Sequence, residues 1–298
     1  MDLEPYRMEL VAYCYRMLGG FHEAEDLVQE TMLRAWKARD RYDSTRASVR
    51  TWLYRIATNA CLTALEGRAR RPLPSGLGPP SRDTEASLTP VFDIPWLQPF
   101  PDARVDLDQR ADLRLALVAA LQYLPPRQRA VLILREVLEF SAAEVAAQLD
   151  TTVTAVNSAL QRARAALANA GDAGELPEPV DARATVDQYL RAFEAADVAA
   201  LVRLLTADAV LEMPPVPLWY RGRLDYGRFM ERVFASRGTG WRTTPVTANG
   251  QPAFAAYAPF ADGPHRLHTL QVLTVAGDRI ARNVVFADPR VFELFLLR

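Results

Sequence analysis

The 298-residue sequence contains few of the residues that build metal sites or disulfide scaffolds. Its two cysteines, Cys14 and Cys61, lie at apolar positions of helical patterns, so we interpret them as reduced core residues of a cytoplasmic protein. They cannot form a zinc site, and the three histidines show no ligand spacing. The sequence therefore predicts neither a bound metal nor a cofactor.

Long apolar runs and a large net charge are also missing. No apolar run approaches the ~18 residues needed to cross a membrane, and no signal peptide is recognisable, so we expect no membrane association. The net charge is −1, and any affinity for nucleic acid must therefore come from local patches. Half of the residues are hydrophobic, which is enough for cores, and the length predicts two or three domains.

Two amphipathic helices are predicted within residues 22–71. The first spans residues 23–38, and Trp36 contributes to its apolar stripe. The second spans about residues 48–70 and buries one face in the same way. A helix over residues 5–18 completes a small domain. On periodicity alone, this pattern fits a helical hairpin with solvated charges equally well.

The strings AEDLVQETMLRAWKA and TWLYRIATNACL resemble region 2 of bacterial sigma factors of the extracytoplasmic-function type, over nearly all of residues 6–71. The resemblance implies that the first helix docks on the clamp helices of RNA polymerase through Asp26, Gln29 and Glu30. It also implies that the second helix opens the minus-ten promoter element. The resemblance places Asn59 and the loop at residues 41–50 against single-stranded DNA. The residues that we predict to contact minus-ten DNA are Arg50, Trp52, Arg55 and Asn59.

The chemistry of these residues suits promoter melting. An extruded base needs an amide that reads its edge, and the Asn59 side chain can both donate and accept hydrogen bonds. Arginines supply cations for the phosphates. Trp52 has two interpretations, because its apolar position fits a residue of the helical core as well as a wedge against the duplex.

Residues 73–108 have the composition of a linker. Prolines punctuate the segment, and it carries six acidic residues against two arginines. Its apolar stretch IPWLQPFPD, residues 94–102, predicts packing on a neighbouring domain. In the sigma-factor family this segment threads the polymerase cleft, where an acidic strand could take the place of nucleic acid.

A second helical domain with a helix-turn-helix is predicted over residues 109–172. A capping box at Ser141 and Glu144 opens a short helix, and a longer helix follows from Val153 with that valine facing inward. The outward-facing residues of the longer helix are Thr154, Asn157, Ser158, Gln161, Arg162 and Arg164.

The stretch from LPPRQRAVL to LQRARAAL is similar to region 4 of the same sigma factors. The similarity implies that the outward-facing residues lie in the major groove of the minus-thirty-five element. There the amides suit base edges, and the arginines suit guanine or phosphate. Without the resemblance, a small helical bundle accounts for the pattern.

After a second predicted linker at residues 173–180, residues 181–298 have the pattern of an α+β domain. The string YLRAFEAADVAALVRLLTADAVLEMPPVPLWYRG resembles SnoaL-like domains of the nuclear-transport-factor-2 superfamily, in which helices and a curved sheet enclose a cone-shaped pocket. Candidate pocket residues are Trp219, Tyr220 and His268. No nucleophile–base pair is recognisable, and a histidine among strand residues is more often structural than catalytic.

Together these features predict a multidomain protein with two all-α domains, sigma region 2 (residues 1–72) and region 4, and a C-terminal α+β SnoaL-like domain. The predicted function is that of an RNA polymerase sigma factor that recognises and melts promoters, has no catalytic activity and is regulated in cis by its SnoaL-like domain. Expected partners are the RNA polymerase core, promoter DNA and a small-molecule ligand in the C-terminal pocket. Two alternatives are a bifunctional protein with a C-terminal enzyme and a DNA-binding regulator that acts without polymerase.

Overall fold

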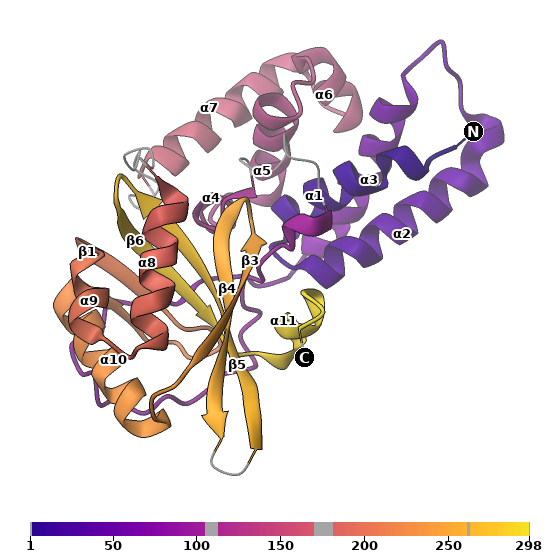
Figure 1. Ribbon diagram of the computed structural model, residues 1–298. Helices are drawn as coiled ribbons and strands as arrows, with labels where there is room; N and C mark the ends of the chain where they lie inside the picture. The colour runs from indigo at the N-terminus through magenta and orange to yellow at the C-terminus, as the bar shows by residue number, and fades with distance from the viewer. Residues whose placement is uncertain (1, 105–112, 170–180, 261–262, 298) are drawn as a thin grey trace. The chain divides into compact units, whose positions relative to one another are not determined.

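The computed structural model places helices in the N-terminal half of the chain and a sheet with helices in the C-terminal half (Figure 1). The predicted start of region 4 at residue 109 and the predicted linker at residues 173–180 lie outside the described residues. The structure describes residues 2–104, 113–169, 181–260 and 263–297.

The chain divides into two compact units, each built from two separate stretches. The first unit combines Met1–Arg71 with Arg104–Gly174, and the second combines Pro72–Ala103 with Glu175–Arg298. The segment predicted as a linker therefore belongs, up to Ala103, to the same unit as the C-terminal domain. Its apolar stretch packs on that domain, as the sequence predicted.

The N-terminal part of the first unit consists of α1 (Arg7–Leu18), α2 (Phe21–Ala38) and α3 (Val49–Leu65). Gly19 ends α1 with a φ of 72°, in the left-handed region that favours glycine. The hydroxyl group of Ser48 caps the start of α3. This helix ends earlier than the sequence predicted, because Gly67 turns the chain with a φ of 68°.

The second part of this unit consists of α4 (Leu115–Leu121), α5 (Pro126–Leu132), α6 (Ala142–Gln148) and α7 (Val153–Asn169). A π-helical turn, Ile133–Val137, continues α5. The predicted capping box is confirmed: Ser141 accepts the Glu144 N–H at 3.2 Å, and the Glu144 carboxylate accepts the Ser141 N–H at 2.7 Å. Val153 was predicted to face inward but is 44% exposed, because it is the first residue of α7 and precedes the packed turns.

A buried arginine joins the two parts of the first unit. Arg129 on α5 donates hydrogen bonds to the carbonyl oxygen of Met17, at the end of α1, and to the carbonyl oxygens of Gln122 and Leu124. The side chain is 3% exposed, and burial lowers the pKa of Arg129 to about 10. The residue is therefore still charged at neutral pH, and these carbonyl oxygens replace the water that it has lost.

The second unit contains a six-stranded sheet in the order β2-β1-β6-β5-β4-β3. Strands β1 and β6 are parallel, and the other neighbours are antiparallel. The strands are β1 (Leu205–Glu212), β2 (Trp219–Arg221), β3 (Arg242–Ala248), β4 (Gln251–Phe260), β5 (Gly263–Ala276) and β6 (Arg279–Phe286). The helices are α8 (Ala182–Glu194), α9 (Val198–Arg203), α10 (Arg223–Arg237) and α11 (Pro289–Leu294).

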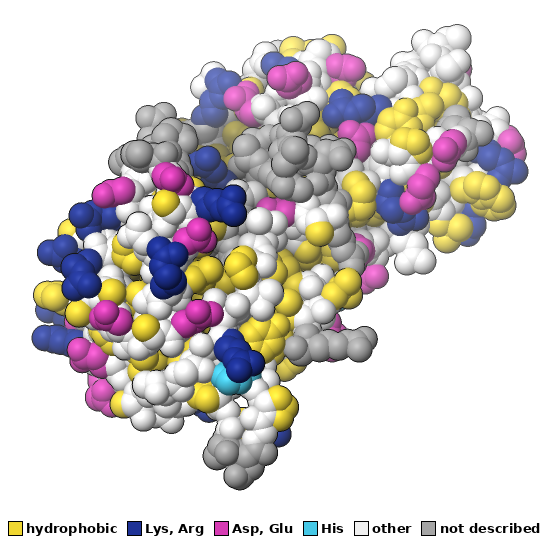
Figure 2. All heavy atoms as spheres, viewed as in Figure 1, with side chains coloured by type: hydrophobic (Ala, Val, Ile, Leu, Met, Phe, Trp, Pro, Cys, Tyr) yellow, Lys and Arg dark blue, Asp and Glu magenta, His cyan; other side chains and the backbone are white. Residues whose placement is uncertain are grey.

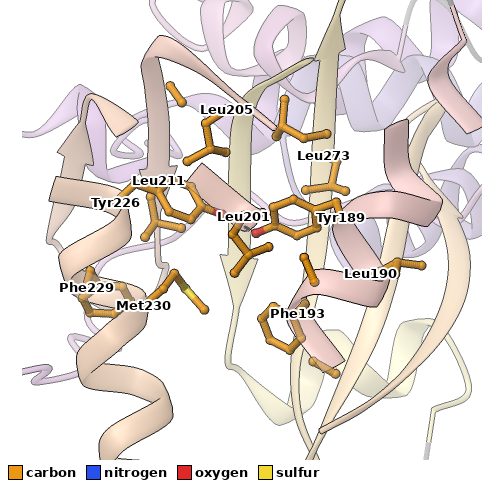
Figure 3. Close-up of a cluster of buried hydrophobic side chains, with 14 of the residues drawn as sticks. Tyr189, Leu190, Phe193, Leu201, Leu205, Leu211, Tyr226, Phe229, Met230 and Leu273 are labelled. Atoms are coloured by element: carbon orange, nitrogen blue, oxygen red, sulfur yellow. Dashed lines mark hydrogen bonds between the residues drawn. The ribbon is translucent and has the colours of Figure 1, made fainter. Parts of the chain in front are cut away.

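Helices α8, α9 and α10 bury their apolar sides against the sheet and form its core (Figure 3). Aromatic rings dominate this core: Phe193 on α8 packs edge-on against Phe234, Trp241 and Phe254, with ring centroids 5.4–5.5 Å apart. Tyr189 on α8 and Tyr226 on α10 turn toward one another, and their hydroxyl groups lie 2.5 Å apart (Figure 3). The predicted α+β layout is therefore confirmed.

Candidate functional site

The outer face of α2 carries the residues predicted to bind polymerase. Asp26, Gln29 and Glu30 are all exposed, and the Glu30 carboxylate pairs with Arg34 at 2.7 Å. Their spacing of three and four residues places them on one side of the helix. The structure thus presents acidic and amide groups together on an accessible surface.

Two apolar residues of α2 are also exposed, and the sequence did not single them out as a surface. Leu33 is 51% exposed and Trp36 is 58% exposed. The prediction that Trp36 belongs to the buried stripe is wrong: its ring lies in the open, with the Arg39 guanidinium 4.4 Å from the ring centroid. An exposed tryptophan and leucine beside acidic groups are typical of a protein-docking surface rather than of a solvated helix.

The residues predicted to contact minus-ten DNA lie on α3 in two different environments. Asn59 is exposed, whereas Trp52 is half-buried with its ring centroid 5.0 Å from that of Tyr42. This contact makes the core interpretation of Trp52 the better supported one. Two arginines, Arg50 and Arg55, contact other parts of the first unit.

Those arginines reach across to the helix-turn-helix part of the unit. Arg55 forms an ion pair with Asp150 at 3.0 Å, and the Arg50 guanidinium lies 4.8 Å from the ring centroid of Phe140. Arg50 also pairs with Glu9 at 3.2 Å. Half of the predicted minus-ten surface is therefore engaged within the first unit.

The outward face of α7 is open along its length. Thr154, Asn157, Ser158, Gln161 and Arg162 are exposed. Arg164 is exposed as well, but its guanidinium pairs with Glu136 at 2.7 Å. The inward face is closed by the buried residues Val156, Leu160 and Ala163, which recur at the three- and four-residue spacing of a helix. The second helix of the helix-turn-helix thus presents amides and one arginine without an ion pair in the described part of the chain.

A cavity of about 480 Å³ lies in the second unit between α10 and the sheet. Of the three residues predicted to form a pocket, His268 lines this cavity and packs at a tilt against Trp241, with ring centroids 5.5 Å apart. Burial and the nearby charge of Arg237 lower the pKa of His268, so the ring is neutral at neutral pH. The described residues contain no cluster of histidine, cysteine and carboxylate groups that could hold a metal ion.

Trp219 and Tyr220 do not line the cavity but hold the segment Pro72–Ala103, which we call the strap. The Trp219 indole N–H donates to the carbonyl oxygen of Gly78 at 2.9 Å, and the Tyr220 hydroxyl group donates to that of Asp83 at 3.1 Å. The structure thus places these two residues outside this cavity, with their polar groups bonded to the strap and the Tyr220 ring packed on Phe229.

The strap is attached along its whole length. Near its start, the Ser75 N–H donates at 2.9 Å to Glu212, a fully buried carboxylate that also pairs with Arg282 at 2.7 Å. In its middle, the Ser81 N–H donates to the carbonyl oxygen of Trp219 at 2.8 Å. Arg232 on α10 then donates to two strap carbonyl oxygens, at 2.7 and 2.8 Å.

The end of the strap is held by the turn between β3 and β4. The Phe100 N–H donates to the Asn249 side-chain oxygen at 2.8 Å, and the Asn249 N–H donates back to the Phe100 carbonyl oxygen at 2.9 Å. The Gly250 N–H donates to the Asp102 carboxylate at 2.8 Å. Pro101 forms a β-bridge with Ala248. Backbone pairing of this kind fixes the register of the strap and not only its proximity.

Sequence comparisons separate the chain into three matched parts. Residues 3–71 match sigma-70 region 2, residues 114–167 match sigma-70 region 4, and residues 186–283 match the SnoaL-like domain. The ECF RNA polymerase sigma factor SigG of Mycobacterium tuberculosis is 48% identical over 98% of this chain and 82% of its own length. SigJ of the same species is 26% identical over 98% of this chain and 92% of its own length.

The fold comparison agrees over the whole chain. The crystal structure of the extracytoplasmic-function sigma factor SigJ of Mycobacterium tuberculosis superposes with a TM-score of 0.69, at 24% identity, and covers 98% of this chain and 97% of that one. Two sigma-70 helical regions, one with an exposed helix-turn-helix face, define a promoter-specificity subunit of RNA polymerase. The chain belongs to the extracytoplasmic-function sigma factors, and it carries a SnoaL-like domain.

This family membership confirms the predicted fold class and the predicted function in transcription initiation, and with them RNA polymerase core and promoter DNA as partners. In the described part of the chain, no helix is both long enough and apolar enough to cross a membrane.

Proposed function

We propose that the SnoaL-like domain regulates this sigma factor in cis by holding the strap that joins region 2 to region 4. The observation that carries the proposal is the docking of the strap, which shares hydrogen bonds with the domain near both of its ends and in its middle. Region 2 and region 4 must reach two promoter elements at once. A connection held on a third domain limits how far they can separate.

The packing of the first unit supports a closed resting state. We assign four side chains to minus-ten DNA. Two of them, Arg50 and Arg55, contact the region 4 part of the unit. The pair of Arg55 with Asp150 is solvent-exposed and contributes at most ~1 kcal/mol, so it gives way readily. The buried Arg129 contributes more to keeping the unit closed, since removing its partners leaves a buried charge uncompensated.

We assign the surfaces of the first unit by their chemistry. The acidic face of α2, together with Leu33 and Trp36, would bind the polymerase core, because it combines charge with an exposed apolar patch. Asn59 would read an extruded base of the minus-ten element. The exposed face of α7 would enter the major groove of the minus-thirty-five element through Asn157, Gln161 and Arg162.

The C-terminal domain acts in this proposal as a binding module and not as an enzyme. The described residues that line its cavity include no aspartate, glutamate or cysteine, and the histidine among them packs against the ring of Trp241. Acid–base or nucleophilic chemistry needs such groups in hydrogen-bonding reach of one another. The face in Figure 2 also has arginines and acids interspersed over α8 and α9, with no continuous basic field among the described residues there. Because bacterial promoter DNA lies in the cytoplasm, a protein that binds it would be located there.

A reversible crosslink tests whether the strap must leave the domain. Pro101 and Ala248 lie opposite each other in an antiparallel bridge, and such pairs are about 4.5–5.5 Å apart at Cα, within the range of a disulfide. The Pro101→Cys/Ala248→Cys protein should lose run-off transcription with core polymerase when oxidised and regain it when reduced. Each single substitution is the control and should not respond to oxidation. Equal transcription from the oxidised and reduced double variant would show that the strap stays docked during initiation.

A further inference from the structure

The floor of the cavity is formed by Asn283, Gln271 and Thr269, which belong to a buried polar network. The Asn283 side-chain amide on β6 donates to the Tyr226 hydroxyl group at 2.8 Å and to the Gln271 side-chain oxygen at 2.7 Å. Tyr226 in turn contacts the hydroxyl group of Tyr189 at 2.5 Å, and Gln271 donates to Thr269 at 3.2 Å. All five side chains are at most 6% exposed. A connected network of this kind positions its members rigidly.

One atom of this network lacks a hydrogen-bond partner within the described part of the chain. The side-chain oxygen of Asn283 is buried, belongs to a residue that lines the cavity, and accepts no hydrogen bond within the described residues. Asn283 itself is 1% exposed. A buried polar atom without a hydrogen bond is costly, and native proteins rarely keep one unless a water or ligand completes it. Asn283 therefore marks the polar end of a binding site.

The other residues of the cavity limit which ligands could bond to Asn283. Leu211, Phe229, Met230 and Val285 supply apolar walls above the network, and the volume of about 480 Å³ is within the usual range for small-molecule sites. Burial raises the pKa of Tyr226 to about 12, so its hydroxyl group is protonated and offers no charge to a ligand. The floor is thus neutral, and a buried anion or cation would find no counter-charge there. Of the two arginines in the lining, Arg232 bonds to carbonyl oxygens of the strap and Arg237 is exposed to solvent, so neither is a buried counter-charge at the floor.

We propose that this cavity binds a neutral, mostly apolar alcohol or phenol whose hydroxyl group bonds to Asn283. The inference rests on the proposal that the domain is a binding module. A hydroxyl group fits either orientation of the amide, because it can donate to the oxygen and can accept from the nitrogen. The apolar body of the molecule then fills the space between α10 and the sheet.

The strap forms part of the same cavity, which ties the ligand to regulation. Leu88 and Pro90 line the cavity from the strap side, and Leu88 is 39% exposed, so these residues lie at the mouth. Arg232, also in the lining, holds the strap carbonyl oxygens of Thr84 and Ala86. A molecule that touches the strap binds the docked state better than the released state. It therefore shifts the equilibrium toward docking.

Affinity measurements with matched probes test the ligand class on the full chain. Titration with 2-naphthol should give binding at least roughly fivefold tighter than 2-methoxynaphthalene or naphthalene, since only the phenol can donate a hydrogen bond to the Asn283 side-chain oxygen. The anion 2-naphthoate should bind more weakly than 2-naphthol. Asn283→Leu should remove the preference for the phenol while leaving naphthalene binding in place. Equal affinities for the phenol and naphthalene, or tighter binding of the carboxylate, would overturn the proposal.

A second measurement does not depend on the Asn283 variant being folded. A crystal of the unaltered chain soaked with 6-bromo-2-naphthol should show the bromine inside the cavity and the hydroxyl oxygen at Asn283. A molecule bound elsewhere on the chain, or in the cavity with its hydroxyl group turned away from Asn283, would contradict the assignment.

Coupling to the strap is measured by hydrogen exchange of the Val91 amide, which donates to the carbonyl oxygen of Pro215 at 2.9 Å. At a 2-naphthol concentration ten times its Kd, the open population of the strap should fall by up to roughly tenfold. Leu88→Ser should reduce this protection. Unchanged Val91 exchange would refute the coupling.

The two proposals fail separately. If the disulfide between strap and domain blocks transcription but no probe prefers Asn283, regulation by the strap stands and the ligand inference falls. If the phenol binds at Asn283 but the disulfide leaves transcription unchanged, the ligand site stands and regulation through the strap falls.

Discussion

The substitution Asn249→Gly tests how strongly the domain binds the strap, because it removes one hydrogen bond between them. Asn249 has a φ of 58°, and Gly250 beside it has a φ of 66°, so both residues of the turn adopt the left-handed conformation. Glycine keeps this turn without strain. The substitution removes the side-chain oxygen that accepts the Phe100 N–H at 2.8 Å and leaves the backbone hydrogen bond to Phe100 in place.

The free-energy cost of the substitution to the docked state follows from the burial of the Phe100 N–H, which loses its acceptor. Phe100 and Asn249 are both fully buried, so the Phe100 N–H finds no water in the docked state. Leaving a buried donor unsatisfied costs about 1–3 kcal/mol. When the strap is released the N–H is hydrated, so the cost falls on the docked state alone. The docking equilibrium should shift toward release by a factor of roughly 5–150.

Hydrogen exchange at Val91, far along the strap from the substitution, is the assay. If the strap leaves the domain as one unit, exchange of the Val91 amide should accelerate by the same factor of roughly 5–150. Asp278→Gly is the control, because it introduces a glycine into the turn between β5 and β6, where the Asp278 side chain pairs with Arg279 and not with the strap. Unchanged exchange at Val91, with accelerated exchange at Phe100, would show that the strap frays from one end, and the reasoning about cooperative release would be wrong.

Further substitutions test the surfaces of the chain one by one. Asp26→Arg should weaken binding to core polymerase in a pull-down assay while the protein stays folded, because it places a cation at an expected carboxylate contact; Lys37→Ala, on the same helix, is a control. Asn59→Ala should leave closed complexes intact and reduce the permanganate footprint of open complexes, by a contact of roughly 1–3 kcal/mol. Arg162→Ala should weaken binding to the minus-thirty-five element and lower its salt dependence by about one ion, whereas Arg164→Ala should do less because Arg164 is paired with Glu136. The pKa of His268 is lowered in the folded state, so the unfolded chain binds the proton first as the pH falls through about 6.5. The free energy of unfolding therefore decreases over this range. In urea denaturation between about pH 7 and pH 5, His268→Gln should make this decrease smaller.

Local sequence signals determined most of the helical elements. The capping box at Ser141 is confirmed because capping depends on residues three apart in the chain. The buried positions of α7 follow from helical periodicity for the same reason. In the second unit, alternating apolar residues predict strands at residues 252–259, 268–275 and 279–286. Strands β4, β5 and β6 match these ranges within a few residues, apart from an earlier start of β5.

The two strands that the sequence did not predict, β2 and β3, are the two edges of the sheet. An edge strand has a neighbour on one side only and buries less apolar surface, so its pattern is weak. Most of β3 is exposed or half-buried, and Pro245 within it reads as a breaker. The edge position itself depends on pairing with β4, a partner set by the fold.

Some residues of the candidate site were likewise predictable from the sequence, and others were not. The outward residues of α2 and α7 were predictable, because each surface lies on one helix and its spacing is visible in the sequence. The exposure of Trp36 was not, since a tryptophan at an apolar position is buried or exposed according to what packs against that face. The engagement of Arg55 with Asp150 joins residues that are 95 positions apart, and no local pattern encodes it.

By itself, the sequence determined the helices, the family and the division into sigma regions and an α+β domain, because these depend on short-range periodicity and on strings of residues that recur in relatives. Only the tertiary structure decided that the proline-rich segment is a docked strap. Its backbone bonds join Phe100 to Asn249 and Ser75 to Glu212. Only the structure brought Asn283 and Gln271 to one cavity floor, with Tyr189 and Tyr226 bonded to Asn283. These side chains come from two helices and two strands, and their hydrogen bonds form only after the sheet and the helices have packed.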